Sequence, residues 1–279
     1  MKKHTILLLF LLPVLAEAQS PWPRSKAGFY TQVAWHFIPE YSEVFVPEGE
    51  YHVMDRALSE GTLEWYGEYG IGSRTTITGV LPIRFLKNGE FLDNFAQPYT
   101  QQGSLSGFGN ISVGVRHQFN KGPMPITGSL RTDFAASAYN DATGLRTGYN
   151  ALTFLPMLST GRGYDKFYWY VYGGYGIRTS DYSDFLDLGA EGGLKIGQVW
   201  IMLFSQWKQP MRNGNIELPF NNRLTSLYVN DQGWVSIGLK SVVEINRFWG
   251  AVVSFAGAAT GQWVPASPGI GGGVYFKWD

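Results

Sequence analysis

The chain has 279 residues, and its 22 lysine and arginine residues balance 22 aspartate and glutamate residues, so the formal net charge is zero and only 16% of residues are charged. Aromatic residues also make up 16%, cysteine is absent, and the mean hydropathy is only −0.11. These values argue against a bundle of apolar membrane helices and a disordered chain, and they exclude disulfides and thiolate chemistry. Because no basic stripe is present, no nucleic acid partner is expected.

The first eighteen residues have the three parts of a secretory signal peptide. Met1-Lys2-Lys3-His4 is a short basic start, residues 6–15 are apolar, and Ala16-Glu17-Ala18 matches the small-x-small cleavage pattern. The apolar part is too short to span a bilayer as a helix. The sequence therefore predicts a signal peptide over residues 1–18 and one mature domain over residues 19–279.

Alternation with period two recurs along the rest of the chain. Between residues 76 and 85, for example, odd positions carry Ile, Gly, Leu, Ile and Phe, while even positions carry Thr, Thr, Val, Pro and Arg. Such alternation is typical of β-strands whose two faces differ. It predicts strands over residues 26–37, 62–70, 75–86, 107–119, 124–138, 149–159, 166–178, 184–196, 199–209, 226–245, 249–258 and 268–278.

Alternation alone fits both a soluble sandwich and a transmembrane barrel, and three further features favour the barrel. The polar faces mix small residues with charges of both signs, which pair across a narrow lumen. Aromatic residues such as Trp35, Phe119 and Trp249 fall at strand ends, as an interfacial girdle requires. Short connections alternate with long ones, which we expect over residues 38–61, 87–105, 139–148 and 210–223. The predicted fold is an all-β, transmembrane antiparallel up-and-down β-barrel of about twelve strands (about ten to fourteen), with short periplasmic turns and longer extracellular loops.

The polar faces of these strands supply the residues expected to line the lumen. They are Glu64, Glu68, Arg84, Arg116, Arg131, Asp133, Tyr168, Tyr170, Tyr172, Arg178, Asp187, Glu191, Lys195, Lys240 and Glu244. The three tyrosines either form an aromatic path for an apolar solute or simply fill the lumen. Residues 19–25, which contain two prolines, are expected either to stay in the periplasm or to fold inward.

The final predicted strand alternates up to Trp278 and resembles the C-terminal signal by which outer-membrane barrels reach their assembly machinery, except that Asp279 follows the aromatic residue. We therefore expect a location in the Gram-negative outer membrane. The expected partners are outer-membrane lipid, lipopolysaccharide, the barrel assembly machinery and a small-molecule solute.

Two segments also resemble a known family. Residues 66–77 read Tyr-Gly-Glu-Tyr-Gly-Ile-Gly-Ser-Arg-Thr-Thr-Ile, a strand, a tight turn and a strand, and are followed by Leu-Pro-Ile at 81–83; residues 107–116 read Gly-Phe-Gly-Asn-Ile-Ser-Val-Gly-Val-Arg. This order, within residues 62–135, is similar to the outer-membrane channels grouped under the phenol meta-degradation heading, relatives of the long-chain fatty-acid channels. The chain departs from that family at Asn110, where aspartate is usual. The resemblance implies passage of small, often apolar molecules through the outer membrane.

The favoured function is thus a channel or passive transporter for small solutes, including hydrophobic ones, with no enzyme activity, no cofactor and no metal. Two alternatives stay open. Paired lumen charges would suit a non-transporting structural or adhesion barrel with a salt-bridged lumen. A lipid-modifying enzyme would need His36 or His117, but neither lies in a recognisable nucleophile pattern. The acidic residues around His52 and around Asp184 lack the spacing of a calcium-binding loop.

Overall fold

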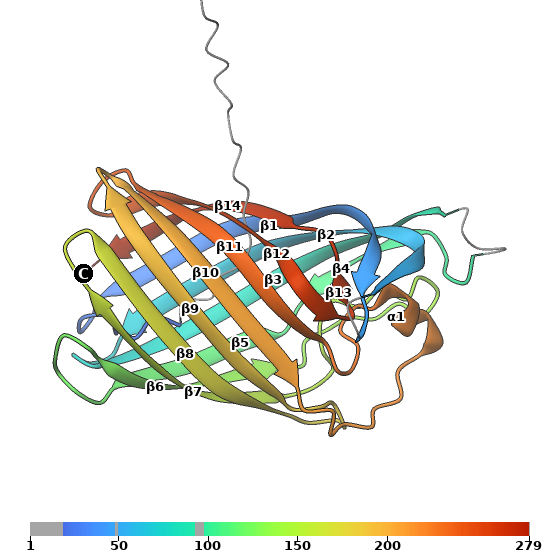
Figure 1. Ribbon diagram of the computed structural model, residues 1–279, viewed down its shortest axis with the longest axis horizontal. Helices are drawn as coiled ribbons and strands as arrows, with labels where there is room; N and C mark the ends of the chain where they lie inside the picture. The colour runs from blue at the N-terminus through green and yellow to red at the C-terminus, as the bar shows by residue number, and fades with distance from the viewer. Residues whose placement is uncertain (1–18, 48–49, 93–97, 279) are drawn as a thin grey trace, which may run out of the picture.

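The computed structural model describes residues 19–47, 50–92 and 98–278, and they form one closed antiparallel β-barrel (Figure 1). The predicted signal peptide lies outside the described residues. The strands are β1 (Phe29–Phe45), β2 (Tyr51–Gly70), β3 (Thr75–Phe91), β4 (Gly103–Phe108), β5 (Ile111–Gln118), β6 (Ile126–Phe134), β7 (Thr153–Gly163), β8 (Phe167–Arg178), β9 (Phe185–Ile196), β10 (Val199–Pro210), β11 (Gly233–Glu244), β12 (Trp249–Gln262), β13 (Val264–Pro265) and β14 (Gly269–Trp278). One short helix, α1 (Phe220–Thr225), lies between β10 and β11. No helix of the described part is long and apolar enough to cross a membrane.

The wall has twelve strands, as predicted, because β4 and β5 are two halves of one wall strand and β13 is a two-residue strand beside β1. Each wall strand pairs with its neighbours in sequence, and β1 closes the barrel by pairing with both β2 and β14. Phe29 lies opposite Tyr69 on one side and Trp278 on the other. Closure leaves no strand edge facing lipid, which is the condition for a sheet to span a bilayer.

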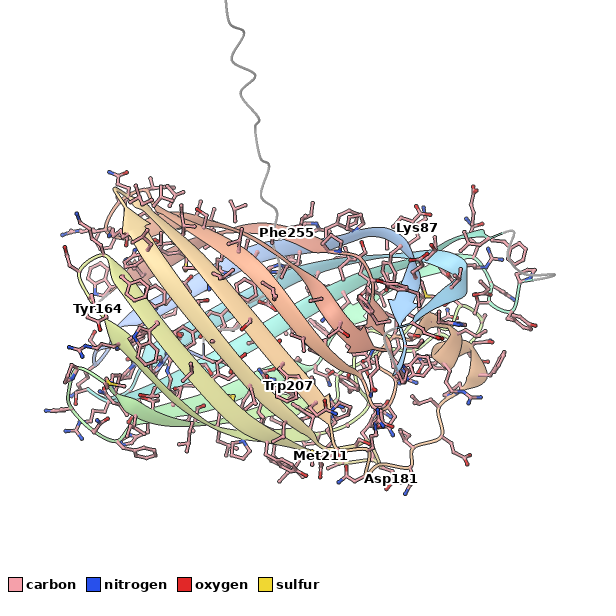
Figure 2. All side chains as sticks on the ribbon, in the orientation of Figure 1. Lys87, Tyr164, Asp181, Trp207, Met211 and Phe255 are labelled. Atoms are coloured by element: carbon pink, nitrogen blue, oxygen red, sulfur yellow. The ribbon has the colours of Figure 1, made fainter. Side chains whose placement is uncertain are left out.

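The predicted outward face is apolar. Side chains such as Val113, Leu158 and Ile237 are 49%, 61% and 51% exposed, although they are large and hydrophobic. In sequence, both faces of strand β10 are apolar. In the structure, Ile201, Leu203 and Trp207 lie on the outside, and Trp207 is labelled in Figure 2. An exposed apolar band around a closed sheet is the face that meets hydrocarbon in an outer-membrane barrel.

The two ends of the barrel differ. We call the end with the short connections at residues 71–74, 119–125, 164–166, 197–198 and 245–248 the turn end, and the other the loop end. Aromatic rings cluster at the turn end, where Phe248 stacks on Trp278 with ring centroids 5.4 Å apart and Trp249 packs edge-on against Phe276 at 5.0 Å. Tyr164 marks this end in Figure 2, while Asp181 and Met211 mark the loop end.

The long connections predicted at 38–61 and 87–105 are partly wrong, because β1, β2 and β3 continue beyond the rest of the wall. The β1–β2 pairing passes two register shifts and resumes as far as Phe45 opposite Tyr51. Alternation is lost here because the inner side of this extension carries a small apolar core, made of Tyr41, Val44, Met54, Leu58, Leu86, Leu145 and Leu227. Leu145 and Leu227 come from the connections β6–β7 and β10–β11, which therefore fold onto the extension at the loop end (Figure 1).

Other predicted bounds also shift. The strand predicted over 226–245 begins only at Gly233, because residues 226–232 belong to the connection that contains α1. The strand predicted over 149–159 lies at Thr153–Gly163, and the one predicted over 124–138 ends at Phe134.

The strand predicted over 107–119 is interrupted at Gly109–Asn110, and the Asn110 side chain explains why. Its amide nitrogen donates to the carbonyl oxygens of Phe134 (3.0 Å) and Tyr149 (2.8 Å), and its amide oxygen accepts from the Tyr149 backbone N–H at 2.7 Å. The side chain thus replaces ladder hydrogen bonds where β6 ends and the chain leaves the wall.

We expect Asn110→Ala to lower the free energy of unfolding by about 1–3 kcal/mol, because it leaves backbone groups of Phe134 and Tyr149 without partners. Denaturant unfolding of the barrel in detergent micelles measures this change. Gln102→Ala, at an exposed loop position, is the control. Equal stability of the two variants would contradict the role given to Asn110.

Candidate functional site

The residues predicted to line the lumen point inward from most strands of the wall. Glu64, Glu68, Tyr168, Lys240 and Glu244 line one interior cavity, and Arg84, Arg131, Asp133, Tyr170, Tyr172, Asp187 and Glu191 line a second. Arg116 lines a small third space, Lys195 forms an ion pair with Glu244, and the Arg178 guanidinium lies over the rings of Tyr149 and Phe185. The interior is therefore polar and charged while the exterior is apolar.

The interior ion pairs run along the wall and do not cross the bore. Arg131 and Asp133 are two residues apart on β6, with nitrogen and oxygen 3.0 Å apart. Lys240 of β11 contacts Glu191 of β9 at 2.7 Å, across the single intervening strand β10. Among the described residues, every ion pair between wall strands joins strands that are adjacent or separated by one other strand. The remaining pairs of this kind are Arg84–Glu60, Arg116–Glu68, Lys195–Glu244 and Lys277–Glu244. The expectation of pairs facing across a narrow lumen is wrong, because neighbouring inward side chains reach each other first.

A group of cations toward the loop end rests on aromatic rings. The Arg178 guanidinium carbon lies 3.9 Å from the ring centroid of Tyr149 and 4.4 Å from that of Phe185. The Lys208 ammonium lies 4.0 Å from the Phe185 centroid and 4.8 Å from that of Trp234. Sequence reasoning missed Lys208. Residues 200, 202 and 204 lie on the same face of β10 as Lys208 and are apolar, so the sequence did not show which face of this strand is the polar one. Cation–π contacts of this kind stabilise charge inside a protein.

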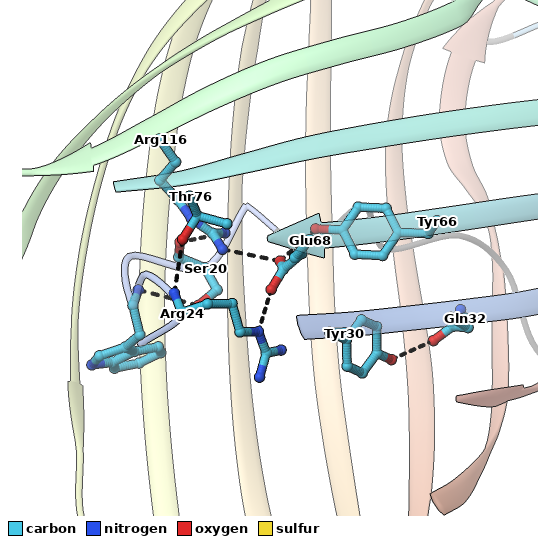
Figure 3. Close-up of polar contacts among 9 residues, drawn as sticks. Ser20, Arg24, Tyr30, Gln32, Tyr66, Glu68, Thr76 and Arg116 are labelled. Carbon is cyan, nitrogen blue, oxygen red and sulfur yellow. Dashed lines mark hydrogen bonds and ion pairs between the residues drawn. The ribbon is translucent and has the colours of Figure 1, made fainter. Parts of the chain in front are cut away.

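Residues before β1 enter the barrel at the turn end (Figure 3). We call Gln19–Ala27 the inserted segment. The Arg116 guanidinium donates to the Ser20 carbonyl oxygen at 3.0 Å, and the Thr127 hydroxyl donates to the Pro21 carbonyl oxygen at 2.6 Å. The Arg24 backbone N–H donates to the Thr76 hydroxyl at 2.8 Å. The sequence left two positions open for residues 19–25, the periplasm and the inside of the barrel. The structure shows the second, because this segment folds inward.

One carboxylate joins the inserted segment to the wall. Glu68 accepts from Arg24 of the segment at 2.5 Å and from Arg116 of β5 at 3.0 Å, and the Tyr66 hydroxyl also donates to it at 2.5 Å (Figure 3). Glu68 is only 3% exposed. A buried carboxylate with two cations and a hydroxyl has its charge well compensated, so this cluster fixes the segment in place.

Aromatic packing completes the closure. The Trp22 ring lies edge-on to Tyr168 and Tyr170, at centroid distances of 5.9 and 6.2 Å, and those two rings are parallel to each other. Such edge-to-face pairs contribute energy beyond area burial. Two of the three predicted lumen tyrosines thus contact the inserted segment. The third, Tyr172, lines the second cavity.

Space remains between the closed ends. The first cavity, of about 310 Å³, lies beside the inserted segment and is bounded by Arg24 and Tyr168. The second, of about 250 Å³, reaches toward the loop end as far as Lys208 and Trp234. Glu64 lines both cavities and therefore lies between them, and we call this position the waist.

Shallower hollows continue this series at both ends. A depression of about 430 Å³ at the loop end shares Lys208 and Trp234 with the second cavity. A depression at the turn end, lined by Ser20 and Trp22, shares Tyr168 and Trp200 with the first cavity. Neighbouring hollows therefore share lining residues, and they follow one another along the barrel.

The loop end is covered by two connections that hold each other. The Thr225 hydroxyl donates to the Gly144 carbonyl oxygen at 2.9 Å, and the Arg146 guanidinium donates to Asn222 at 2.9 Å. Gly144 has φ +71°, and a Cβ there would lie 2.2 Å from the Asn221 carbonyl oxygen, so only glycine fits this crossing. The cover is thus a packed structure joined to the apolar core of the β1–β3 extension.

Asp184, at the rim of this end, is held ionised by hydrogen bonds. Burial acts to raise the pKa of this carboxyl, but donation from Asn213, the Arg178 backbone N–H and the Tyr175 hydroxyl outweighs it and lowers the pKa below its usual value. The carboxylate therefore ties the β8–β9 connection to the β10–β11 connection.

The histidines form no catalytic arrangement in the described residues. The His117 ring nitrogen Nδ1 lies 2.8 Å from the Thr75 hydroxyl, outside the barrel near the turn end. His36 faces the first cavity, and neither of its ring nitrogens has a hydrogen-bond partner among the residues described. No group of three histidine, aspartate or glutamate residues in the described part is arranged to hold a metal ion.

Comparison with known proteins identifies the fold of the chain. No family model matches the chain, and no curated protein matches it. Among solved structures, an outer-membrane channel from Pseudomonas putida F1 superposes with a TM-score of 0.65 at 11% identity, over 95% of this chain and 100% of that one. The β-domain of the Bordetella autotransporter BrkA superposes with a TM-score of 0.53 at 13% identity, over 91% of this chain and 100% of that one. The chain therefore has the fold of an outer-membrane β-barrel.

The inserted segment gives a direct test of how firmly the turn end is closed. Since the chain has no cysteine, Ser20→Cys creates a single reporter thiol. In a Glu68→Gln background Arg24 and Arg116 lose their shared carboxylate, and we expect the thiol to react with a water-soluble maleimide about tenfold faster or more.

The matched control is Lys26→Cys, an exposed position of the same segment, whose reaction rate should be high in both backgrounds. An unchanged rate at position 20, with the barrel still folded, would show that Glu68 does not hold the segment.

Proposed function

We propose that this protein is an outer-membrane channel for small solutes, and that the inserted segment closes it at the turn end. The supporting observation is the series of neighbouring hollows along the polar interior, between two ends closed by non-covalent contacts. The solute passes Lys208 and Trp234, the second cavity, Glu64 and the first cavity. It leaves when the inserted segment moves.

The orientation follows from the fold. Outer-membrane barrels have short turns in the periplasm and longer loops outside, so the turn end with the inserted segment faces the periplasm. A signal peptide over residues 1–18 delivers the chain there, the assembly machinery inserts it, and lipopolysaccharide surrounds the loop end. Cleavage after Ala18 would make Gln19, which lines the second cavity, the first residue of the mature chain.

The solute is small, because the two interior cavities measure about 310 and 250 Å³. Their walls combine aromatic rings with charged groups, so an amphipathic solute is favoured over a purely apolar one. The outer-membrane channel from Pseudomonas putida F1 shares the fold, and its description as a channel agrees with this proposal.

We expect the double substitution Trp22→Ala with Arg24→Gln to raise solute permeation, because it removes the edge-on ring contacts and the Glu68 ion pair of the inserted segment. Liposome swelling with small sugars and amino acids, together with conductance in planar bilayers, measures the increase. Lys26→Gln, in the same segment but exposed, should behave as the natural chain. Absence of passage in every variant, with the barrel intact, would refute the channel.

A sealed, non-transporting barrel is the second candidate, because most interior charges are paired. It predicts that Arg131→Gln with Glu191→Gln destabilises the barrel without changing permeability. In a channel we expect the same variant to change permeability, since Arg131 and Glu191 both line the second cavity. Liposome swelling and conductance, with denaturant unfolding as the stability measurement, separate the two outcomes.

A further inference from the structure

Glu64 is an unusual carboxylate in this barrel. It is 9% exposed, and it makes no hydrogen bond or ion pair with any described residue, although it lies in a membrane-spanning strand. The charge of Arg84 on β3 acts on Glu64, but the two side chains form no ion pair. The contacts of Arg84 are Glu60 at 3.9 Å and the Tyr228 ring at 5.5 Å. A carboxylate removed from bulk water without a hydrogen bond is costly, so a carboxylate that faces a cavity favours the binding of a positive group there.

The other charged groups of the first cavity already have partners. Arg24 is held by Glu68, Lys277 by Glu244, and Lys240 by Glu191. None of these cations contacts Glu64, and each would lose its own carboxylate by moving to it.

His36 is the second unsatisfied group of this cavity. It is 9% exposed, and both ring nitrogens lack a partner among the described residues. On the β1–β2 ladder His36 lies opposite Thr62, and Ala34 lies opposite Glu64, so His36 and Glu64 are diagonal neighbours on the inner face. Diagonal neighbours in antiparallel strands are close enough for long side chains to contact one ligand together.

The rest of the cavity suits the apolar body of a small ligand. Tyr30 and Tyr275 are stacked at 5.4 Å, and Trp200 packs against Tyr168 at 5.3 Å. The part of the cavity wall that β12 and β14 contribute has small residues, namely Val252, Ser254 and Gly273. At about 310 Å³ the space accommodates about ten water-sized groups. Aromatic rings stabilise an organic cation through their faces.

We infer that the first cavity is a binding site for a small organic amine, whose ammonium group pairs with Glu64 and hydrogen-bonds to His36 while its apolar body lies among the tyrosines and Trp200. This inference rests on the proposed channel, because it names the class of solute that the lumen takes up. Glu64 then acts as the residue that discriminates at the waist: it favours a protonated amine over a carboxylate of the same size.

Three probes with the same ring test the inference: benzylamine, benzyl alcohol and benzoate. Binding to the full mature chain in detergent at neutral pH is measured by isothermal titration, for the natural inserted segment and for the Trp22→Ala, Arg24→Gln variant. We expect benzylamine to bind and benzoate not to bind. Glu64→Gln should weaken benzylamine by about tenfold or more, because the charged partner is lost. Glu43→Gln, at an exposed position on β1, should leave the affinity unchanged.

Tighter binding of benzoate than of benzylamine, or no binding of benzylamine to either chain, overturns the inference. Equal benzylamine affinity in Glu64→Gln also overturns it. Conductance of the same preparations is recorded separately: a barrel that conducts without binding benzylamine is a channel with another solute. A barrel that binds benzylamine without conducting supports the site and refutes the channel.

Discussion

The lipid bilayer imposes the constraint on which this structure depends: every backbone group must be paired inside the sheet, and polar side chains must be kept from hydrocarbon. Closing β1 onto β14 satisfies the first requirement. Alternation satisfies the second, because it directs one side chain in two inward. The charges collected inside then need partners of their own, because many of them are buried away from bulk water. The interior ion pairs, the cation–π contacts of Arg178 and Lys208 and the Glu68 cluster all follow from that need.

How those charges pair determines whether the barrel has a bore. Pairs that bridged opposite walls would fill it, but Arg131–Asp133 and Lys240–Glu191 connect near neighbours on one wall. Closure is therefore left to two separate structures, the inserted segment and the loop cover. The inserted segment is short and held by a few polar and aromatic contacts, whereas the cover has an apolar core with fully buried Leu145.

Much of the wall could be predicted from the sequence, because a strand facing lipid on one side and a polar lumen on the other must alternate. Strands β8 and β9 lie within one residue of their predicted bounds for this reason. Where the environment changes, so does the pattern: beyond Ile38 the β1–β2 pair has an apolar core on its inner side, and the alternation that defined the strand is lost. Asn110 shows a further limit, since its role depends on Phe134 and Tyr149, far away in the sequence.

Sequence alternation predicts a set of lumen residues, but it does not predict a site. Parity places Glu64, Glu68 and Glu191 on one face, yet only the three-dimensional neighbours distinguish them. Glu68 has two cations and Glu191 has Lys240 and the Tyr168 hydroxyl. Glu64 makes no hydrogen bond or ion pair with any described residue, although the charge of Arg84 acts on it. The inserted segment that supplies one partner of Glu68 has no periodicity, and its contacts join residues far apart in sequence, such as Arg24 with Glu68 and Trp22 with Tyr170. A carboxylate left without a partner amid a network that satisfies its neighbours is therefore the feature most informative about the solute, and only the structure reveals it.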